Sequence, residues 1–422
     1  MKNLFAGSLC FAAVMANEVA FAAAKAAPII DVSKVNTFKA AACLIILLVA
    51  FILFFTEKLP IAVTSMLIPA ALAFPGIDIL KGNRAYSNFG QNWVVTFLAV
   101  FILGEAIFRT GLATKIGNFA VHFAGKENPR RFILVVGTVI AFVSAFLSNS
   151  AVMAMFVPIL VASAKTSRLG ISVVALPMAF MIEVGGNLTL IGAASKGVVN
   201  GLMETYKIRP FGFFEFTPIG LVMMVIALIY FAFIGYKLIP ERTPSAEGSA
   251  MMGGKFDESQ MRWDKMPIAT VIFVAVIAAM VTGFLKPPVA AMLGAMLCVI
   301  TKCISIKEAY TAVNWNTIFL FAGTLALGDA LIATGADKLL AKYLVNYITT
   351  PYVLLVVVLV LVCLVSNFMS NTAAASVTTP IAIACASAFN VNPLPFCMAV
   401  AAGCSWSFLT PIACYLQREL QC

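Results

Sequence analysis

The sequence predicts an all-α membrane protein with about ten transmembrane helices in two inverted repeats, each with a re-entrant hairpin and a broken helix. Hydrophobic residues form 62% of the 422-residue chain and charged residues only 11%, too few for a soluble protein. Apolar runs close to the ~20 residues that span a bilayer recur along the chain, and lipid forces such runs to be helical. They cover residues 38–55, 61–74, 93–108, 132–147, 213–238, 268–285, 316–333 and 353–365.

An internal repeat is the most informative feature of the sequence. Four motif pairs keep the same order at offsets of 222, 224, 222 and 221 residues: Asn92-Trp93 with Asn314-Trp315, 104–111 with 328–335, Ser148-Asn149-Ser150-Ala151 with Ser370-Asn371-Thr372-Ala373, and 188–191 with 409–412. Chance similarity between apolar helices could produce one such match, but not four in register. The repeat therefore predicts a duplicated fold, and an odd number of crossings in each half would invert the second copy.

The chain divides into four predicted segments. Residues 1–24 are expected to form a signal peptide or a first transmembrane segment, because a basic start, an apolar stretch and a small-residue cleavage site follow one another. Residues 36–238 form the N-terminal repeat, and residues 239–266, rich in proline, glycine and charge, form a cytoplasmic linker. Residues 267–422 form the C-terminal repeat, which is expected to be truncated because it lacks a counterpart of 213–238.

The charge pattern and the rare residue types exclude several classes of function. The net charge of +10 comes from Lys and Arg in short loops, which is typical of an inner-membrane multi-pass protein and does not indicate a nucleic-acid partner. Ten cysteines without a C-x-x-C pair and one histidine, His122, placed in a loop, indicate neither disulfides nor a cofactor. An enzyme would need clustered histidines, cysteines or paired acids at membrane depth, so the sequence argues against one.

The two Ser-Asn motifs are the first candidate site. Residues 132–165 are apolar on both sides of Ser148-Asn149-Ser150 and basic at both ends, which predicts a re-entrant hairpin with a polar tip and a second half-helix beginning at Ala151. A half-helix N-terminus favours a carboxylate or sulfate, and Ser and Asn oxygens suit a small cation. Residues 366–379 repeat the arrangement. One copy alone could simply join two helices, but two matching copies favour a binding role.

A broken helix is the second candidate. Gly185, Gly186, Asn187 and Gly192 interrupt an apolar span and would expose backbone carbonyl groups, and the matching segment in the second half is 405–411. Close helix packing through glycine is the alternative. Glu183 lies beside this break and is a candidate for proton coupling, since acids in a membrane interior are usually functional. Glu105 and Asp329 correspond between the repeats and are interpreted as structural groups near span ends.

These motifs resemble those of the divalent anion/sodium symporter family over roughly residues 36–413. The resemblance implies sodium-coupled symport of small divalent anions (C4-dicarboxylate, citrate or sulfate), an elevator-type mechanism in a lipid bilayer, and a homodimer. Sodium is the only metal it implies, at Ser144, Ser148, Asn149 and Gly192 in the first repeat and at Ser366, Ser370, Asn371 and Ala413 in the second. The substrate-binding residues that it implies are Ser148, Asn149, Ser150, Ala193, Ser370, Asn371, Thr372 and Cys414.

The sequence also departs from the family pattern. Lys196 stands where asparagine is usual, and Glu183 stands where a small residue is expected. A proton-coupled or arsenite-permease-like anion carrier shares the hairpin architecture and is an alternative. A non-transporting remnant is another, because the C-terminal repeat is expected to be truncated. The sequence fixes neither the anion nor the stoichiometry.

Overall fold

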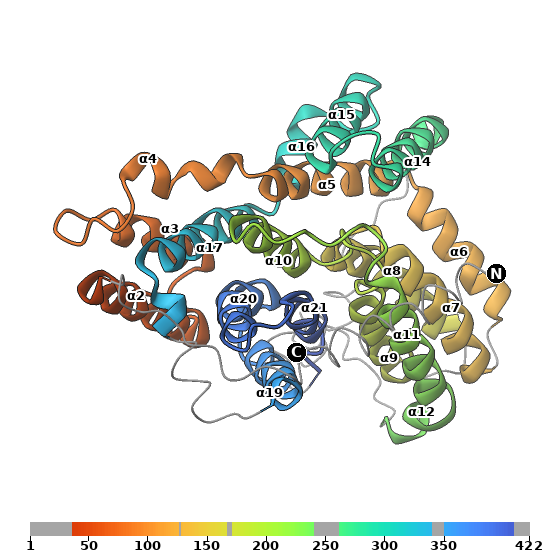
Figure 1. Cartoon of the computed structure of the whole chain (residues 1–422). Coiled ribbons are helices and arrows are strands. Elements are labelled where there is room, and N and C mark those ends of the chain that lie inside the picture. Colours follow the sequence, from red (N-terminus) through yellow and green to blue (C-terminus); the bar gives the residue numbers. More distant parts are fainter. Residues whose placement is uncertain (1–35, 126–127, 167–170, 240–260, 340–349, 409–422) are drawn as a thin grey trace. The chain divides into compact units, whose positions relative to one another are not determined.

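The computed structural model describes residues 36–125, 128–166, 171–239, 261–339 and 350–408 (Figure 1). These residues fold into helices and irregular connections, and no strand occurs among them. The predicted segment 1–24, most of the linker 239–266 and the last residues of the C-terminal repeat lie outside the described residues.

The helices follow the order that the apolar runs predict. The first half contains α2 (Thr37–Thr56), α3 (Ile61–Leu72), α4 (Gly82–Ala85), η2 (Ser87–Gly90), α5 (Asn92–Arg109), α6 (Leu112–Ala124), α7 (Pro129–Ser144), α8 (Asn149–Thr166), α9 (Ile171–Gly185), α10 (Ala194–Thr205), α11 (Thr217–Tyr230), η3 (Phe231–Gly235) and α12 (Tyr236–Leu238). The second half contains η5 (Trp263–Lys265), α14 (Met266–Thr282), α15 (Pro287–Ile300), α16 (Ile306–Ala312), α17 (Trp315–Thr334), α19 (Pro351–Ser366), α20 (Asn371–Ala388) and α21 (Leu394–Gly403).

Five helical stretches among the described residues are long and apolar enough to cross a membrane: α2, α5, α11 through α12, η5 with α14, and α17. Shorter apolar helices, among them α3, α15 and α19, accompany them. Only 28% of the most apolar stretch of α2, and 17% of that of η5 with α14, is buried inside the protein. Apolar helices with so much exposed surface are suited to contact with lipid, so the all-helical membrane class is confirmed, while the count of ten spans and their inversion stay predictions.

The sequence repeat reappears as a repeat of helix boundaries. α7 and α19 are 16-residue helices that begin at prolines 222 positions apart, Pro129 and Pro351. α8 and α20 are 18-residue helices that begin at Asn149 and Asn371, again 222 positions apart. Proline at the first helical position and serine before the next helix are favoured terminal residues, so the same local chemistry produces the same helix–connection–helix unit twice.

The chain forms two compact units, and each combines segments from both halves of the sequence. Within the described residues, unit 1 contains 36–94, 195–211, 315–339 and 350–407, and unit 2 contains 95–125, 128–166, 171–194, 212–239, 261–314 and 408. The compact units are therefore not the two sequence repeats. The first tip belongs to unit 2 and the second tip to unit 1.

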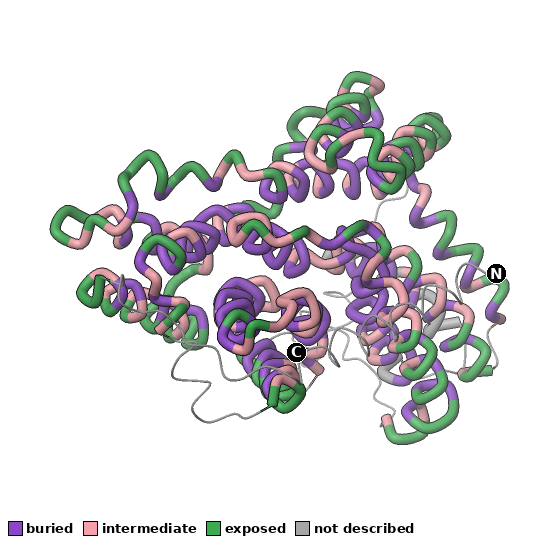
Figure 2. Tube along the Cα trace, in the orientation of Figure 1, coloured by how far each residue is buried: buried purple, intermediate pink, exposed green. Residues whose placement is uncertain are grey.

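In unit 1, α17 packs against α2, α3, η2 and α20. The α17–α3 contact is the closest of these, because the backbone of Ser65 occupies the space where a side chain at Gly323 would lie. α19, α20 and α21 pack on one another, and α20 is buried along most of its length, as the purple tube in Figure 2 shows. A buried helix of small and polar residues in this position can present its N-terminus to a ligand without exposing its sides to lipid.

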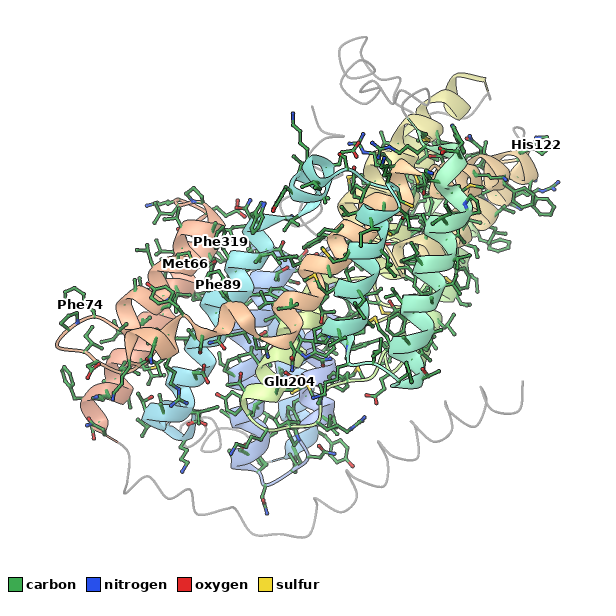
Figure 3. All side chains as sticks on the ribbon, turned by 90° about the horizontal axis from the view of Figure 1, so that it is seen from above. Met66, Phe74, Phe89, His122, Glu204 and Phe319 are labelled. Carbon is green, nitrogen blue, oxygen red and sulfur yellow. The ribbon has the colours of Figure 1, made fainter. Side chains whose placement is uncertain are left out.

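The first Asn-Trp motif has a structural role in unit 1. The indole Nε1 of Trp93 donates to Glu204 Oε1 at 3.0 Å, and the amide groups of Gln91 and Asn92 approach Glu204 Oε2 at 3.3 Å each. Glu204, at the end of α10, is labelled in Figure 3. One carboxylate therefore holds the start of α5 to the end of α10. The second copy differs, because Trp315 is 45% exposed.

In unit 2, α7 packs against α6, α8, α9 and α11, and α14 packs against α15. The α7–α9 crossing is close because the backbone of Ala141 fills the space beside Gly185, at the end of α9. α6 was not among the predicted apolar spans. It is an amphipathic helix that exposes Phe119 and Phe123, and an exposed apolar face of this kind suits a membrane interface. His122 lies in the last turn of α6 and not in a loop, at the edge of Figure 3.

An ion cluster in unit 2 anchors the end of the linker to segments from both halves of the chain. The guanidinium of Arg262 donates to both carboxylate oxygens of Glu308 at 2.8 and 3.2 Å, and the N–H of Arg262 donates to the carbonyl of Arg109 at 2.9 Å. Arg109 also pairs with Glu105 at 2.7 Å. Glu308 completes a capping box with Ser305 at the start of α16. Glu105 thus has an ionic partner near the end of its helix. Its counterpart in the second repeat, Asp329, has a polar partner, because it accepts a hydrogen bond from the Asn88 amide at 3.0 Å.

We expect this cluster to make stability depend on pH. Burial raises the pKa of Glu308, but hydrogen bonds from Arg262 and Ser305 outweigh it and lower the pKa from its ordinary value of 4.5 to about 2. Because the pKa of Glu308 is lower in the folded chain, its carboxylate contributes fully to the free energy of unfolding above pH ~4.5. This contribution is lost as the pH falls towards ~2. Solvent screening limits it to about 1 kcal/mol.

The measurement compares the thermal unfolding of the wild-type chain and of Glu308→Gln in detergent between pH 7 and pH 3. We expect the wild-type chain to be more stable at pH 7, with a difference that narrows below pH 4.5. A constant difference across this range would show that the carboxylate does not titrate in contact with Arg262.

Candidate functional site

The first tip is the short connection between α7 and α8. The Ser148 hydroxyl accepts from the N–H of Ala151 at 3.4 Å, and the Ser148 carbonyl accepts from Val152 at 3.0 Å. Ser148 is therefore the N-cap of α8, which begins at Asn149 and not at the predicted Ala151. The N-terminal end of a helix of this length carries a partial positive charge that favours an anion. Ser150 belongs to the first turn of α8, but its side chain is outside the described atoms.

Oxygen atoms converge on Ser144, at the end of α7. Its hydroxyl oxygen lies 2.7 Å from the carbonyl oxygen of Ile182 and 3.1 Å from Oδ1 of Asn149. A hydroxyl has one proton, so it can donate fully to only one of these two acceptors at a time. When the proton is directed at one of these acceptors, the other oxygen still faces the hydroxyl, and oxygens arranged in this way are suited to a small cation.

The glycines of the broken helix bring further carbonyl groups to this tip. A side chain at Gly192 would begin 2.7 Å from the carbonyl oxygen of Gly186 and 3.0 Å from that of Ala145, and one at Gly186 would begin 3.2 Å from Oδ1 of Asn149. The Thr189 hydroxyl also bonds to the Ala145 carbonyl. The structure therefore brings Ser144, Asn149 and Gly192 together, and Ser148 adjoins them along the chain. Serine, amide and carbonyl oxygens are the hard ligands that a sodium ion requires.

The second tip has the same cap and different contacts. The Ser370 hydroxyl accepts from the N–H of Ala373 at 3.3 Å, so Ser370 is the N-cap of α20. Ser407 donates to Oδ1 of Asn371 at 3.0 Å, which joins the second broken segment to the tip. The Ser366 hydroxyl donates to the carbonyl of Cys363 within its own helix at 3.1 Å, whereas the Ser144 hydroxyl faces Asn149 across the first tip.

The remaining implied site residues are distributed as follows. Thr372 lies in the first turn of α20 and Ala193 just before α10, and both are half-buried. Ala413 and Cys414 lie outside the described residues. Ser407 was missed as a site residue, although the offset of 221 residues that pairs 188–191 with 409–412 places it opposite Gly186, at the break of the first half. That correspondence was the signal that could have identified it.

Two buried charged residues flank the first break. Glu183 is 8% exposed and lies in the last turn of α9, and Lys196 is fully buried in the first turn of α10. Charged groups inside membrane proteins are rare because desolvation is unfavourable, and they are retained mostly where ions or substrates pass. Along the chain, opposite charges therefore stand at the two borders of the broken segment.

The apolar helices and the repeated capped tips define a multi-pass membrane transporter of the plasma membrane. A family model described as "Citrate transporter" (CitMHS) matches residues 51–403, so the chain belongs to this family. The resemblance to the divalent anion/sodium symporters is confirmed with it.

Three relatives illustrate the range of similarity. An uncharacterized transporter of Synechocystis, sll0640, is 31% identical over 49% of this chain and 33% of its own length. The sodium-dependent dicarboxylate transporter SdcS of Staphylococcus saprophyticus is 24% identical over 85% of this chain and 75% of its own. The crystal structure of the Alcanivorax borkumensis YdaH transporter shares the fold, with a TM-score of 0.57, 15% identity, and coverage of 88% of this chain and 90% of that one.

Proposed function

We propose that the chain is a secondary active transporter that couples the inward movement of sodium ions to the uptake of a small divalent anion. The observation that supports this most is the pair of Ser-capped, Asn-initiated helices, α8 and α20, at positions 222 residues apart. Two equivalent anion-binding ends suit a substrate with two anionic groups. The name of the SdcS relative describes sodium-dependent dicarboxylate transport in that protein, and we place a C4-dicarboxylate ahead of citrate and sulfate for this chain.

In this mechanism sodium binding precedes anion binding. The oxygens of Ser144, Asn149 and Gly192 hold one sodium ion, with Ser148 beside them, and Ser366, Ser370, Asn371 and Ala413 hold another. An ion among these oxygens removes their mutual repulsion and fixes the Asn side chains, so that each amide N–H can donate to a substrate carboxylate. Ser150, Thr372, Ala193 and Cys414 complete the substrate contacts.

Charge balance explains why the substrate would be bound only with sodium. A dianion entering a low-dielectric site carries a large desolvation penalty, and two sodium ions compensate its charge. Neutral tips alone would bind it weakly. We further propose that the loaded site crosses the membrane by an elevator-type movement within a homodimer, as the family resemblance implies.

The experiment that tests the proposal is uptake of radiolabelled succinate by proteoliposomes containing the full chain. We expect accumulation with an inward sodium gradient and background uptake with potassium in place of sodium. Citrate and sulfate serve as competing anions, and the one that inhibits best identifies the substrate class. Uptake that ignores sodium would contradict the proposal.

A proton-coupled anion carrier is the second candidate, and the burial of Glu183 beside the break favours it. The same proteoliposomes distinguish the two functions, because a proton carrier responds to an imposed pH gradient without sodium. In that outcome Glu183 becomes the first residue to replace by glutamine.

A further inference from the structure

Asn187 lies in the loop between α9 and α10, where it belongs to the predicted break of the helix, but no binding role was predicted for it. Its side chain is 2% exposed. Both polar atoms of its amide, Oδ1 and Nδ2, are buried without a hydrogen-bond partner among the described residues. Buried side-chain amides in folded proteins nearly always have partners, so an amide with both ends unpaired requires an explanation.

A comparison within the chain shows that the fold can satisfy a buried asparagine. Asn200, in α10, is fully buried, and its amide donates to the carbonyl of Phe211 at 3.0 Å and accepts from the N–H of the same residue at 2.9 Å. Asn187 has neither kind of contact. An apolar residue of the same size would fill its place without the desolvation penalty of an unpaired amide, so the contacts among the described residues do not account for asparagine at this position.

The backbone holds Asn187 where it is. Its N–H donates to the carbonyl of Val184 at 3.0 Å, and the next carbonyl, of Leu188, accepts from the Thr217 hydroxyl at 2.6 Å. α11 packs so closely on the Asn187 carbonyl that a side chain at Gly220 would overlap with it. The backbone of this loop is therefore held in place by α9 and α11.

The loop that holds Asn187 also forms the first tip site. Gly186, the preceding residue, lies beside Oδ1 of Asn149, and its carbonyl faces Gly192. This neighbourhood supplies oxygens for a cation, and the N-terminus of α8 supplies N–H groups for an anion. An asparagine amide has one group of each kind, an oxygen for a cation and an N–H for an anion.

We propose that Asn187 is a binding residue that joins the cation to the anion, with Oδ1 contacting the cation and Nδ2 donating to a carboxylate oxygen. The inference rests on the proposed function of the first tip. A cation at Oδ1 polarises the amide and makes its N–H a stronger donor, so each ligand raises the affinity for the other. By linkage the two affinities change by the same factor.

The test uses Asn187→Leu, which removes the polar atoms and keeps the volume, and Asn200→Leu as the matched control. Thermal unfolding of each purified full chain is measured in detergent with potassium chloride, with sodium chloride, and with sodium chloride plus succinate. We expect Asn187→Leu without ligand to unfold at or above the wild-type temperature, and to lose the shift that sodium and succinate together produce. Its apparent Kd for succinate rises at least tenfold.

The control is expected to behave in the opposite way. Asn200→Leu removes the two hydrogen bonds between the Asn200 amide and the backbone of Phe211, so it unfolds at a lower temperature and keeps the ligand-induced shift. A lower unfolding temperature for ligand-free Asn187→Leu would show a structural role and overturn the proposal. A full ligand shift in Asn187→Leu would also overturn it, and a buried water would then be the partner of the amide.

The wild-type chain tests the proposed function separately. If citrate, sulfate or a lower pH raises the unfolding temperature of the wild-type chain and sodium with succinate does not, the proposed ligands are wrong. The Asn187→Leu comparison is then made with the ligand that raises this temperature. A wild-type chain that none of these ligands stabilises contradicts both proposals.

Discussion

Replacing Asn149 or Asn371 by alanine is expected to lower kcat/KM for sodium-driven uptake by roughly 10- to 100-fold each. Either change removes an amide from a tip, and a hydrogen bond to a charged group contributes about 1.5–3 kcal/mol. The Asn149→Ala change also removes the oxygen that lies beside Ser144 and Gly186. The Asn371→Ala change removes the acceptor of the hydrogen bond from Ser407. Initial rates of succinate uptake into proteoliposomes, over a range of sodium and succinate concentrations, measure both effects.

Asn128→Ala is the matched control for the first tip. Asn128 is the N-cap of α7, at the other end of the same helix pair, and accepts from the N–H groups of Arg130 and Arg131. Its removal is expected to reduce stability by about 1 kcal/mol and to leave the KM for sodium unchanged. Equal losses of transport in Asn128→Ala and Asn149→Ala would mean that the tip contributes only to folding.

The variant Asn149→Asp separates the two roles of the amide. A carboxylate in place of the amide would keep an oxygen for the cation, but it would lose the N–H donor and add a negative charge. We expect Asn149→Asp to bind sodium at least as well as the wild-type chain and to transport succinate worse than Asn149→Ala. Normal succinate transport by this variant would exclude a contact between the Asn149 amide and the anion.

The sequence predicted the helix start at the first tip to within two residues, because the features that set it are local. Serine before a helix, asparagine at its start and proline at the start of the preceding helix each favour a conformation within a few residues, and the repeat showed that the pattern occurs twice. The boundaries of α2, α5 and α17 also follow the apolar runs to within one or two residues. Lipid allows a long apolar run few structures other than a helix.

The features that could not be predicted depend on contacts between distant segments. The approach of Ser144 to the Ile182 carbonyl joins residues 38 positions apart, and the division into two compact units combines both halves of the sequence. α6 was missed because its apolar face is too narrow to form an uninterrupted run. The unpaired state of Asn187 is visible only after every neighbouring donor and acceptor has been placed.

Gly323→Ala is expected to destabilise unit 1 by about 2–3 kcal/mol and to lower the yield of folded protein. The backbone of Ser65, in α3, lies within the volume that a methyl group at Gly323 would need, so α3 and α17 must separate or tilt. Backbone atoms cannot move aside as a flexible side chain can, and overpacking typically costs about 1–3 kcal/mol. The loss appears as a lower midpoint of thermal or denaturant unfolding in detergent.

Gly104→Ala provides the control, because Gly104 also lies within a long apolar helix, α5. Its nearest neighbour, Cδ2 of Leu147, would be 3.6 Å from the added methyl group, an ordinary contact. Since alanine favours a helix over glycine by up to about 1 kcal/mol, Gly104→Ala should be neutral or stabilising. If both variants unfolded at the wild-type midpoint, α3 and α17 could not be in backbone contact. A loss confined to Gly323→Ala would instead show that a glycine permits this helix pair to form, because small residues at helix contacts in membranes allow a close approach.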